Sequence, residues 1–103
     1  RWFRPVQGQF NIYYRRGLDQ PEYVPDFVAA TSETNLLIET KKAGDLQTDE
    51  VQIKARAAVQ WCEHASTYAR QHGSRPWKYL LIPHDAVAVS ATLVGLARTF
   101  QCC

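Results

Sequence analysis

Two neighbouring stretches decide the fold: Tyr23-Val-Pro-Asp-Phe-Val-Ala-Ala30 and Leu36-Leu-Ile-Glu-Thr-Lys41. Each is short and rich in residues that favour strands, and the small polar residues of Thr31 to Asn35 separate them. This pattern predicts two strands joined by a hairpin turn. Pro25 has no backbone N–H to give to a sheet, so it predicts a bend near Asp26.

Side chains alternate across the predicted strand Leu36 to Lys41, which gives it two different faces. One face carries Leu37, Glu39 and Lys41. The other carries Leu36, Ile38 and Thr40 and is the more apolar.

Upstream, Gln9 to Arg16 mixes aromatic and polar residues without a breaker and predicts a further strand, closed by the turn-forming residues 17–21. Downstream, Lys42 to Gln47 is a loop, and Thr48 can cap a helix that runs to His72 and stops at Gly73. Apolar residues recur in that helix at three- and four-residue steps. They are Val51, Ala55, Ala58, Cys62, Ala65 and Tyr68 or Ala69.

The remaining segments are a strand and a helix. Trp77 to Ile82 is a nearly continuous apolar run that predicts a buried strand, with Pro83-His84-Asp85 as its exit. Ser90 can cap a final helix reaching Phe100. We expect an α/β fold in the order β-β-β-α-β-α, with hairpins that pair antiparallel and a crossover helix that permits a parallel pair.

Length and composition limit the class of protein. With 103 residues, 46% of them apolar and 21% charged, the chain is expected to form a single domain. The longest uncharged stretch, Ala86 to Ala97, is too short for a membrane span, and no secretory signal is visible. We therefore expect a cytoplasmic protein with no membrane contact. The sequence lacks Met, which suggests a fragment of a longer protein, and its three cysteines are expected to be reduced thiols.

The residues best suited to chemistry are Asp26, Glu39 and Lys41. If the two deciding strands pair, they bring two carboxylates and an ammonium together. Carboxylates held this close repel unless a cation neutralises them, and Mg²⁺ does so while keeping water and phosphate oxygens as its other ligands. A metal site follows, in which Asp26 and Glu39 bind Mg²⁺, with Mn²⁺ as a substitute, and Lys41 orients water or stabilises charge on a phosphodiester.

The order Pro-Asp followed by Glu-x-Lys on adjacent predicted strands resembles the PD-(D/E)XK nuclease superfamily. Further similarity to the carboxy-terminal endonuclease domain of type III restriction enzymes and related helicase-linked proteins lies in Lys54-Ala-Arg-Ala-Ala58, Trp61-Cys62 and Tyr79 to Asp85. The resemblance covers residues 23–87. It implies a restriction-endonuclease-like sheet, metal ligands at Asp26 and Glu39 and a catalytic lysine at Lys41. The leading helix of that family core is absent or truncated here.

Several other residues have two interpretations. Lys54 either contacts a phosphate or the site carboxylates, or lies on the surface with its stem along the helix. Arg15 and Arg16, in a run of arginines and aromatics that also includes Arg1 and Arg4, suit phosphate contact and base stacking, but an exposed edge strand has the same composition. His84 and Asp85 are expected to belong to a turn, and Trp61, Tyr68 and Trp77 to the core.

Three functions remain open at this point. The first is a Mg²⁺-dependent DNA endonuclease domain of a restriction system, working with a helicase or translocase domain or a modification subunit outside this chain. The second is a non-catalytic DNA-binding or protein-docking module of a larger machine. The third is a stand-alone DNA repair nuclease on the same fold.

Overall fold

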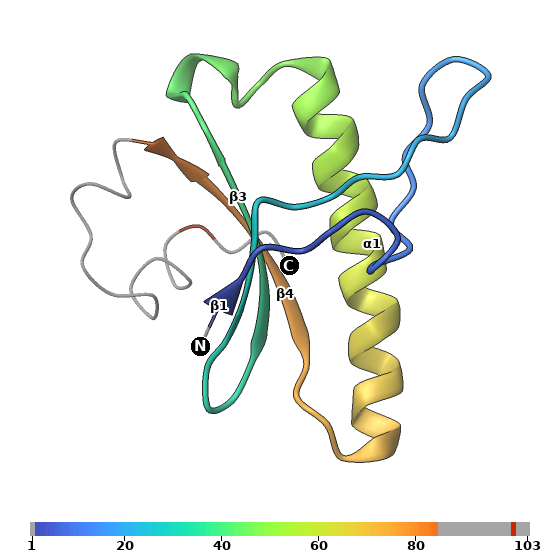
Figure 1. Ribbon diagram of the computed structural model, residues 1–103, viewed down its shortest axis with the longest axis vertical. Coiled ribbons are helices and arrows are strands. Elements are labelled where there is room, and N and C mark those ends of the chain that lie inside the picture. The colour runs from blue at the N-terminus through green and yellow to red at the C-terminus, as the bar shows by residue number, and fades with distance from the viewer. Residues whose placement is uncertain (1, 85–99, 101–103) are drawn as a thin grey trace.

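The computed structural model describes residues 2–84 and Phe100. It is an α/β fold in which a four-stranded mixed sheet carries one long helix on one of its faces (Figure 1). The strands lie in the order β1-β2-β3-β4. Their bounds are β1 Trp2–Phe3, β2 Phe27–Ala30, β3 Asn35–Lys41 and β4 Trp77–Pro83; a 3₁₀ turn, η1 (Ala43–Asp45), and the helix α1 (Asp49–His72) lie between β3 and β4.

The predicted hairpin between the deciding strands is confirmed. β2 and β3 pair antiparallel with Val28 opposite Leu37. The turn is closed by Thr31, whose backbone N–H donates to the Thr34 carbonyl at 2.8 Å and whose Oγ1 accepts from the Thr34 N–H at 3.0 Å. Asn35, expected in the turn, already belongs to β3.

The second strand is shorter than predicted, beginning at Phe27 rather than Tyr23. Pro25 cannot donate to a neighbouring strand. At Asp26 the side chain, rather than the backbone, bonds to β3: its Oδ2 accepts a hydrogen bond of 3.0 Å from the backbone N–H of Thr40. The predicted bend at Asp26 is present.

The predicted first strand at Gln9–Arg16 is wrong. This segment folds back on 19–23 as a hairpin held by isolated bridges between Tyr13 and Glu22 and between Arg16 and Asp19, so its backbone pairs locally and not with the sheet. The first strand is instead β1, which pairs antiparallel with β2. The number of strands before the helix is as expected, but the identity of the first differs.

The long helix is confirmed at both ends. Thr48 Oγ1 accepts the N–H of Val51 at 3.4 Å, and Gly73 ends the helix in the left-handed conformation, at φ 68°, which glycine adopts without strain. Of the two alternatives at the carboxyl end of the predicted stripe, Ala69 is the buried one and Tyr68 is 63% exposed, and Ser66 is buried in addition. Ser66 is buried because its hydroxyl bonds to both the N–H and the carbonyl of Trp77, which ties α1 to the start of β4.

The predicted parallel strand is also confirmed, since β4 lies alongside β3 in parallel. Its side chains alternate between two apolar clusters, one on each face of the sheet. The helix-side cluster contains Leu37 and Tyr79 with Ala55, Ala58 and Cys62 of α1, and Trp61 and Trp77 pack against it. Both tryptophans, expected in the core, are partly buried and pack against it.

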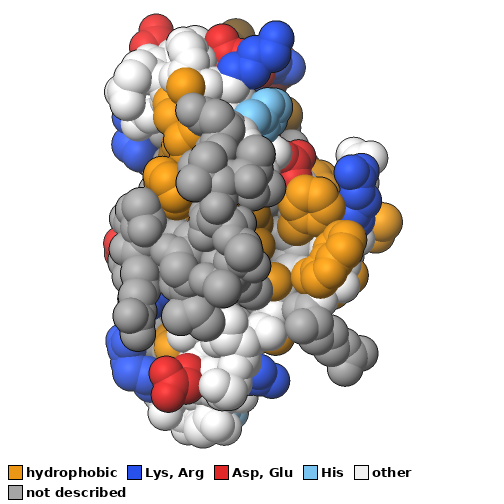
Figure 2. All heavy atoms as spheres, turned by 90° about the vertical axis from the view of Figure 1, so that its left-hand side faces the viewer, with side chains coloured by type: hydrophobic (Ala, Val, Ile, Leu, Met, Phe, Trp, Pro, Cys, Tyr) orange, Lys and Arg blue, Asp and Glu red, His pale blue; other side chains and the backbone are white. Residues whose placement is uncertain are grey.

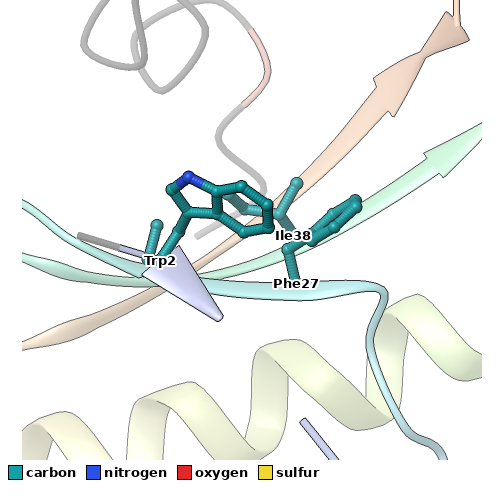
Figure 3. Close-up of a pocket in the computed structure, with 4 residues that line it drawn as sticks. Trp2, Phe27 and Ile38 are labelled. Atoms are coloured by element: carbon teal, nitrogen blue, oxygen red, sulfur yellow. The ribbon is translucent and has the colours of Figure 1, made fainter. Parts of the chain in front are cut away.

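The face of the sheet away from α1, called here the outer face, carries the second cluster, which includes Leu36, Ile38, Leu80 and Ile82. Hydrophobic side chains are visible on this side in Figure 2. Trp2 and Phe27 stand there edge to face at 5.4 Å, next to Ile38 (Figure 3). With Ala29 they line an apolar pocket of about 270 Å³.

The predicted final helix from Ser90 lies outside the described residues except for Phe100, which packs against the outer-face cluster. Cys102, Cys103 and Asp85 also lie outside them, whereas Cys62 is buried in α1. Within the described part of the chain, no helix is both long enough and apolar enough to cross a membrane.

Candidate metal centre

Asp26 lies at the amino end of β2, half-buried, with its carboxylate turned toward β3. Its Oδ2 accepts two hydrogen bonds from Thr40, one from the backbone N–H at 3.0 Å and one from the hydroxyl at 3.1 Å. No hydrogen bond from residues 2–84 or Phe100 reaches Oδ1. Within the described part of the chain, one carboxylate oxygen is therefore fixed and the other has no hydrogen-bond partner.

Glu39 lies near the carboxyl end of β3 and is only 6% exposed. Its two oxygens have different partners. Oε1 accepts a hydrogen bond of 2.7 Å from the Tyr23 hydroxyl, and Oε2 lies 3.3 Å from Lys41 Nζ. A carboxylate buried to this degree is costly unless it is paired, and here both of its oxygens have a donor.

The three predicted residues share a neighbourhood. The register of β2 and β3 ends with Phe27 opposite Ile38, so Asp26 lies one residue before the paired strand, where its Oδ2 bonds to Thr40 and its charge acts on Glu39. Along β3, Glu39 lies on the face that also carries Leu37. Lys41 is two residues along the same strand, so it joins that face. The face is the one that packs against α1, because Leu37 of the same set belongs to the helix-side cluster.

The electrostatics agree with this proximity. Burial raises the pKa of the Glu39 carboxyl, the hydrogen bond from Tyr23 lowers it, the negative charge of Asp26 raises it, and the Lys41 ammonium lowers it. The net effect is a raised pKa, because loss of hydration outweighs the donors. An added cation would favour the ionised form that burial disfavours.

Two tyrosines complete the centre. Tyr23 and Tyr79 are both buried, with their hydroxyl oxygens 2.9 Å apart. The proton of Tyr23 is directed to Glu39, so the Tyr79 hydroxyl donates to Tyr23. Burial first, then the nearby Tyr79 and Glu39, raises the pKa of Tyr23, which keeps it a neutral donor.

Sequence reasoning missed these tyrosines as members of the site, although both lie in segments predicted as strands. The available signal was chemical, because a tyrosine in a buried strand needs a partner for its hydroxyl. Tyr79 of β4 lies opposite Leu37 of β3, which is two residues before Glu39. The Tyr79 side chain is therefore on the face of the sheet that carries Glu39, and a partner for its hydroxyl is expected there.

Lys54 does not join the carboxylates by any contact among the described residues. Its Nζ lies 3.4 Å from Glu50, one helical turn earlier, and 5.5 Å from the centre of the Tyr14 ring. Arg16 approaches the same Glu50 at 3.7 Å. Arg15 is exposed and forms no ion pair within the described residues.

The donor set fits Mg²⁺ with a small number of protein ligands. Within residues 2–84 and Phe100, no group of three or more His, Cys, Asp or Glu side chains gathers around one point. Mg²⁺ commonly takes one or two carboxylates and completes its octahedron with water and phosphate oxygens. Asp26 Oδ1 and Glu39 Oε2 are the atoms that would hold it.

Comparison with known proteins adds no relative, because no protein-family model, curated protein or solved structure matches the chain.

Proposed function

We propose that the chain is a Mg²⁺-dependent DNA endonuclease domain that hydrolyses phosphodiester bonds, on a restriction-endonuclease-like fold of the PD-(D/E)XK kind. One observation carries the proposal: Glu39 is buried between Lys41 and Tyr23, with Asp26 across the adjacent strand close enough to raise its pKa. Two acids that could hold a metal ion, with a lysine beside them, suit metal-assisted phosphodiester hydrolysis.

Each residue has a separate part. Asp26, fixed through Thr40, presents Oδ1, and Glu39, fixed through Tyr23, presents Oε2. Bound there, Mg²⁺ would supply charge neutralisation for a phosphodiester and a water of lowered pKa. Lys41, whose side chain is 36% exposed and whose Nζ lies 3.3 Å from Glu39 Oε2, would stabilise negative charge on the reacting phosphate.

The assembly we propose is larger than this chain. DNA is the substrate, and a helicase or translocase domain or a modification subunit of a restriction system would direct the nuclease to it. The sequence contains no phosphate-binding Gly-x-x-x-x-Gly-Lys loop, so the motor would be a separate element.

A second candidate is a non-catalytic DNA-binding or docking module. It is favoured by the internal partners of the acids, since both oxygens of Glu39 and one oxygen of Asp26 are already occupied. On this alternative the same residues act only to hold β2, β3 and β4 together.

Cleavage of plasmid DNA in Mg²⁺ or Mn²⁺ tests the proposal. The variant Asp26→Asn keeps an acceptor for Thr40 while removing the charge, and Glu33→Gln, on the exposed turn after β2, is the matched control. We expect cleavage to fall more than about 100-fold in Asp26→Asn and to be unchanged in Glu33→Gln. Equal cleavage by wild type and Asp26→Asn would remove the assignment, and DNA binding without cleavage by the wild type would favour the second candidate.

A further inference from the structure

A groove separate from the metal centre lies between the hairpin of residues 13–20 and the amino-terminal half of α1. The hairpin projects beside this part of the helix in Figure 1. The groove encloses about 420 Å³, within the range of small-ligand sites. Its walls are Tyr13 and Arg15 on the hairpin side and Arg56 and Gln60 on α1, with Ile53 and Ala57 between them.

The charged side chains that line the groove are those of two arginines. Arg15 and Arg56 are both exposed, and neither forms an ion pair within residues 2–84 and Phe100. Among the described residues, the lining of the groove contains no Asp or Glu. Asp19 lines an adjacent hollow together with Arg15, and Glu63 lines another together with Arg56. Two guanidinium groups facing a shared space attract an anion with spaced charges.

The neighbouring cations Arg16 and Lys54 share one acidic partner, which distinguishes them from these two arginines. Arg16 and Lys54 both approach Glu50, at 3.7 and 3.4 Å. An anionic ligand would therefore meet its strongest attraction at Arg15 and Arg56.

An aromatic face completes the site. Tyr13 is 54% exposed although large apolar rings favour burial, and it lines the groove. Bases of a single strand stack on exposed aromatic rings while arginines contact the phosphates. In a duplex the base faces are already stacked, so the ring has no equivalent partner there.

We infer that this groove binds a single-stranded segment of nucleic acid, with a base on Tyr13 and phosphates at Arg15 and Arg56. The inference needs no metal and goes beyond the proposed nuclease. The hairpin is a fixed wall for such a strand, because Arg16 and Asp19 exchange two backbone hydrogen bonds of 3.0 Å across the turn. The hairpin is also tied to the metal centre, since the Tyr23 amide donates to the Ile12 carbonyl at 2.8 Å.

Fluorescence anisotropy in EDTA, with labelled single-stranded DNA, single-stranded RNA and duplex DNA, tests the inference. We expect single strands to bind more tightly than duplex, and Tyr13→Ala to weaken that binding by about 5- to 150-fold. Arg15→Gln and Arg56→Gln should each weaken binding and lower the salt dependence, log K against log salt, by about 0.7. Comparison of DNA with RNA identifies which single strand the groove prefers.

Arg70→Gln is the matched control, because Arg70 is an exposed arginine in the last turn of α1. It should leave binding unchanged. Equal losses in Arg70→Gln and Arg56→Gln, an unaffected Tyr13→Ala, or no binding of single strands would overturn the inference. Cleavage that persists without groove binding would overturn the groove alone, and groove binding without cleavage would count against the nuclease alone.

Discussion

The two faces of the sheet bury their side chains in different environments. On the outer face, Ile38 packs with Trp2 and Phe27 around a pocket lined only by apolar side chains. On the helix side, one residue further along β3, Glu39 is buried among Tyr23, Tyr79 and Lys41. Adjacent residues of a single strand thus enter an apolar environment and a hydrogen-bonded one.

The difference shows which face of the sheet can bury a carboxylate. Burying apolar surface is favourable wherever water is excluded, whereas a buried carboxylate is tolerated only if its neighbours supply donors. The helix side provides two such donors, Tyr23 before β2 and Lys41 on β3, and Tyr79 on β4 in turn donates to the Tyr23 hydroxyl. Such a set is expected to be sensitive to the loss of any one hydroxyl.

The largest effect is expected from the fully buried residue of the helix side. Leu37→Ala removes a side chain that is 0% exposed and should lower the free energy of unfolding by about 4 kcal/mol. Ile38→Ala, its neighbour on the outer face, should cost only about 2 kcal/mol because it borders an existing pocket. Urea denaturation of both variants measures the difference, and an equal or reversed order would contradict the contrast between the faces.

The next largest effect concerns the buried hydroxyl. Tyr23→Phe leaves Glu39 Oε1 without its donor and should destabilise the protein by about 1 to 3 kcal/mol. Tyr68→Phe, which removes a hydroxyl from a residue that is 63% exposed, should stay within about 0.5 kcal/mol. Thermal denaturation of the pair measures this, and a harmless Tyr23→Phe would show that Glu39 does not depend on the phenol.

A smaller, pH-dependent effect follows from the raised pKa of Glu39. The folded state holds the Glu39 proton more tightly than the unfolded chain, whose glutamate pKa is about 4.3. This contribution to stability is therefore greatest below pH 4.3 and is lost as pH rises through the interval up to the raised value, by at most about 1.4 kcal/mol per pH unit.

The variant Glu39→Gln removes this titration, so its stability relative to wild type should increase as pH rises through that interval. Urea denaturation across a pH series measures the difference, with Glu33→Gln as the control on an exposed turn. A difference that changes in the opposite direction would mean that the donors outweigh burial at Glu39.

The smallest effect is expected at the rim of the outer face. Trp2 is 65% exposed and keeps an edge-to-face contact with Phe27 at 5.4 Å. Trp2→Ala should cost about 0.5 to 1.5 kcal/mol, the value of such an aromatic pair. Denaturation of Trp2→Ala beside Val6→Ala, a residue that is 66% exposed, measures it, and a loss above 3 kcal/mol would show that the outer face contributes more than its exposure indicates.

The sequence predicted those elements whose signals are local. Thr48 and Gly73 mark the ends of α1 through capping and backbone conformation, and the Thr31 turn joins two strongly patterned strands. The start of the sheet was not predictable in this way. Gln9–Arg16 has the composition of a strand, but its backbone is satisfied by residues 19–23, and a two-residue strand at Trp2 has almost no pattern of its own.

The candidate site likewise contains residues that local patterns predict and residues that depend on contacts between distant parts of the chain. Alternation along β3 put Glu39 and Lys41 on one face, and the hairpin brought Asp26 beside β3, where it bonds to Thr40. The Tyr23 and Tyr79 hydroxyls depend on contacts across 16 and 56 residues, respectively, which no local pattern carries. The role of Lys54 stayed ambiguous in the sequence because the direction of its side chain depends on its contacts with Glu50 and Tyr14.

Calorimetric titration with Mn²⁺ tests the central claim most directly, because it measures the cation itself and needs no DNA. The account predicts that wild type binds Mn²⁺ and that Asp26→Asn, with its bonds to Thr40 still possible, binds at least about 10-fold more weakly. Absence of binding by a folded wild-type protein, or an affinity that Asp26→Asn leaves unchanged, would contradict it.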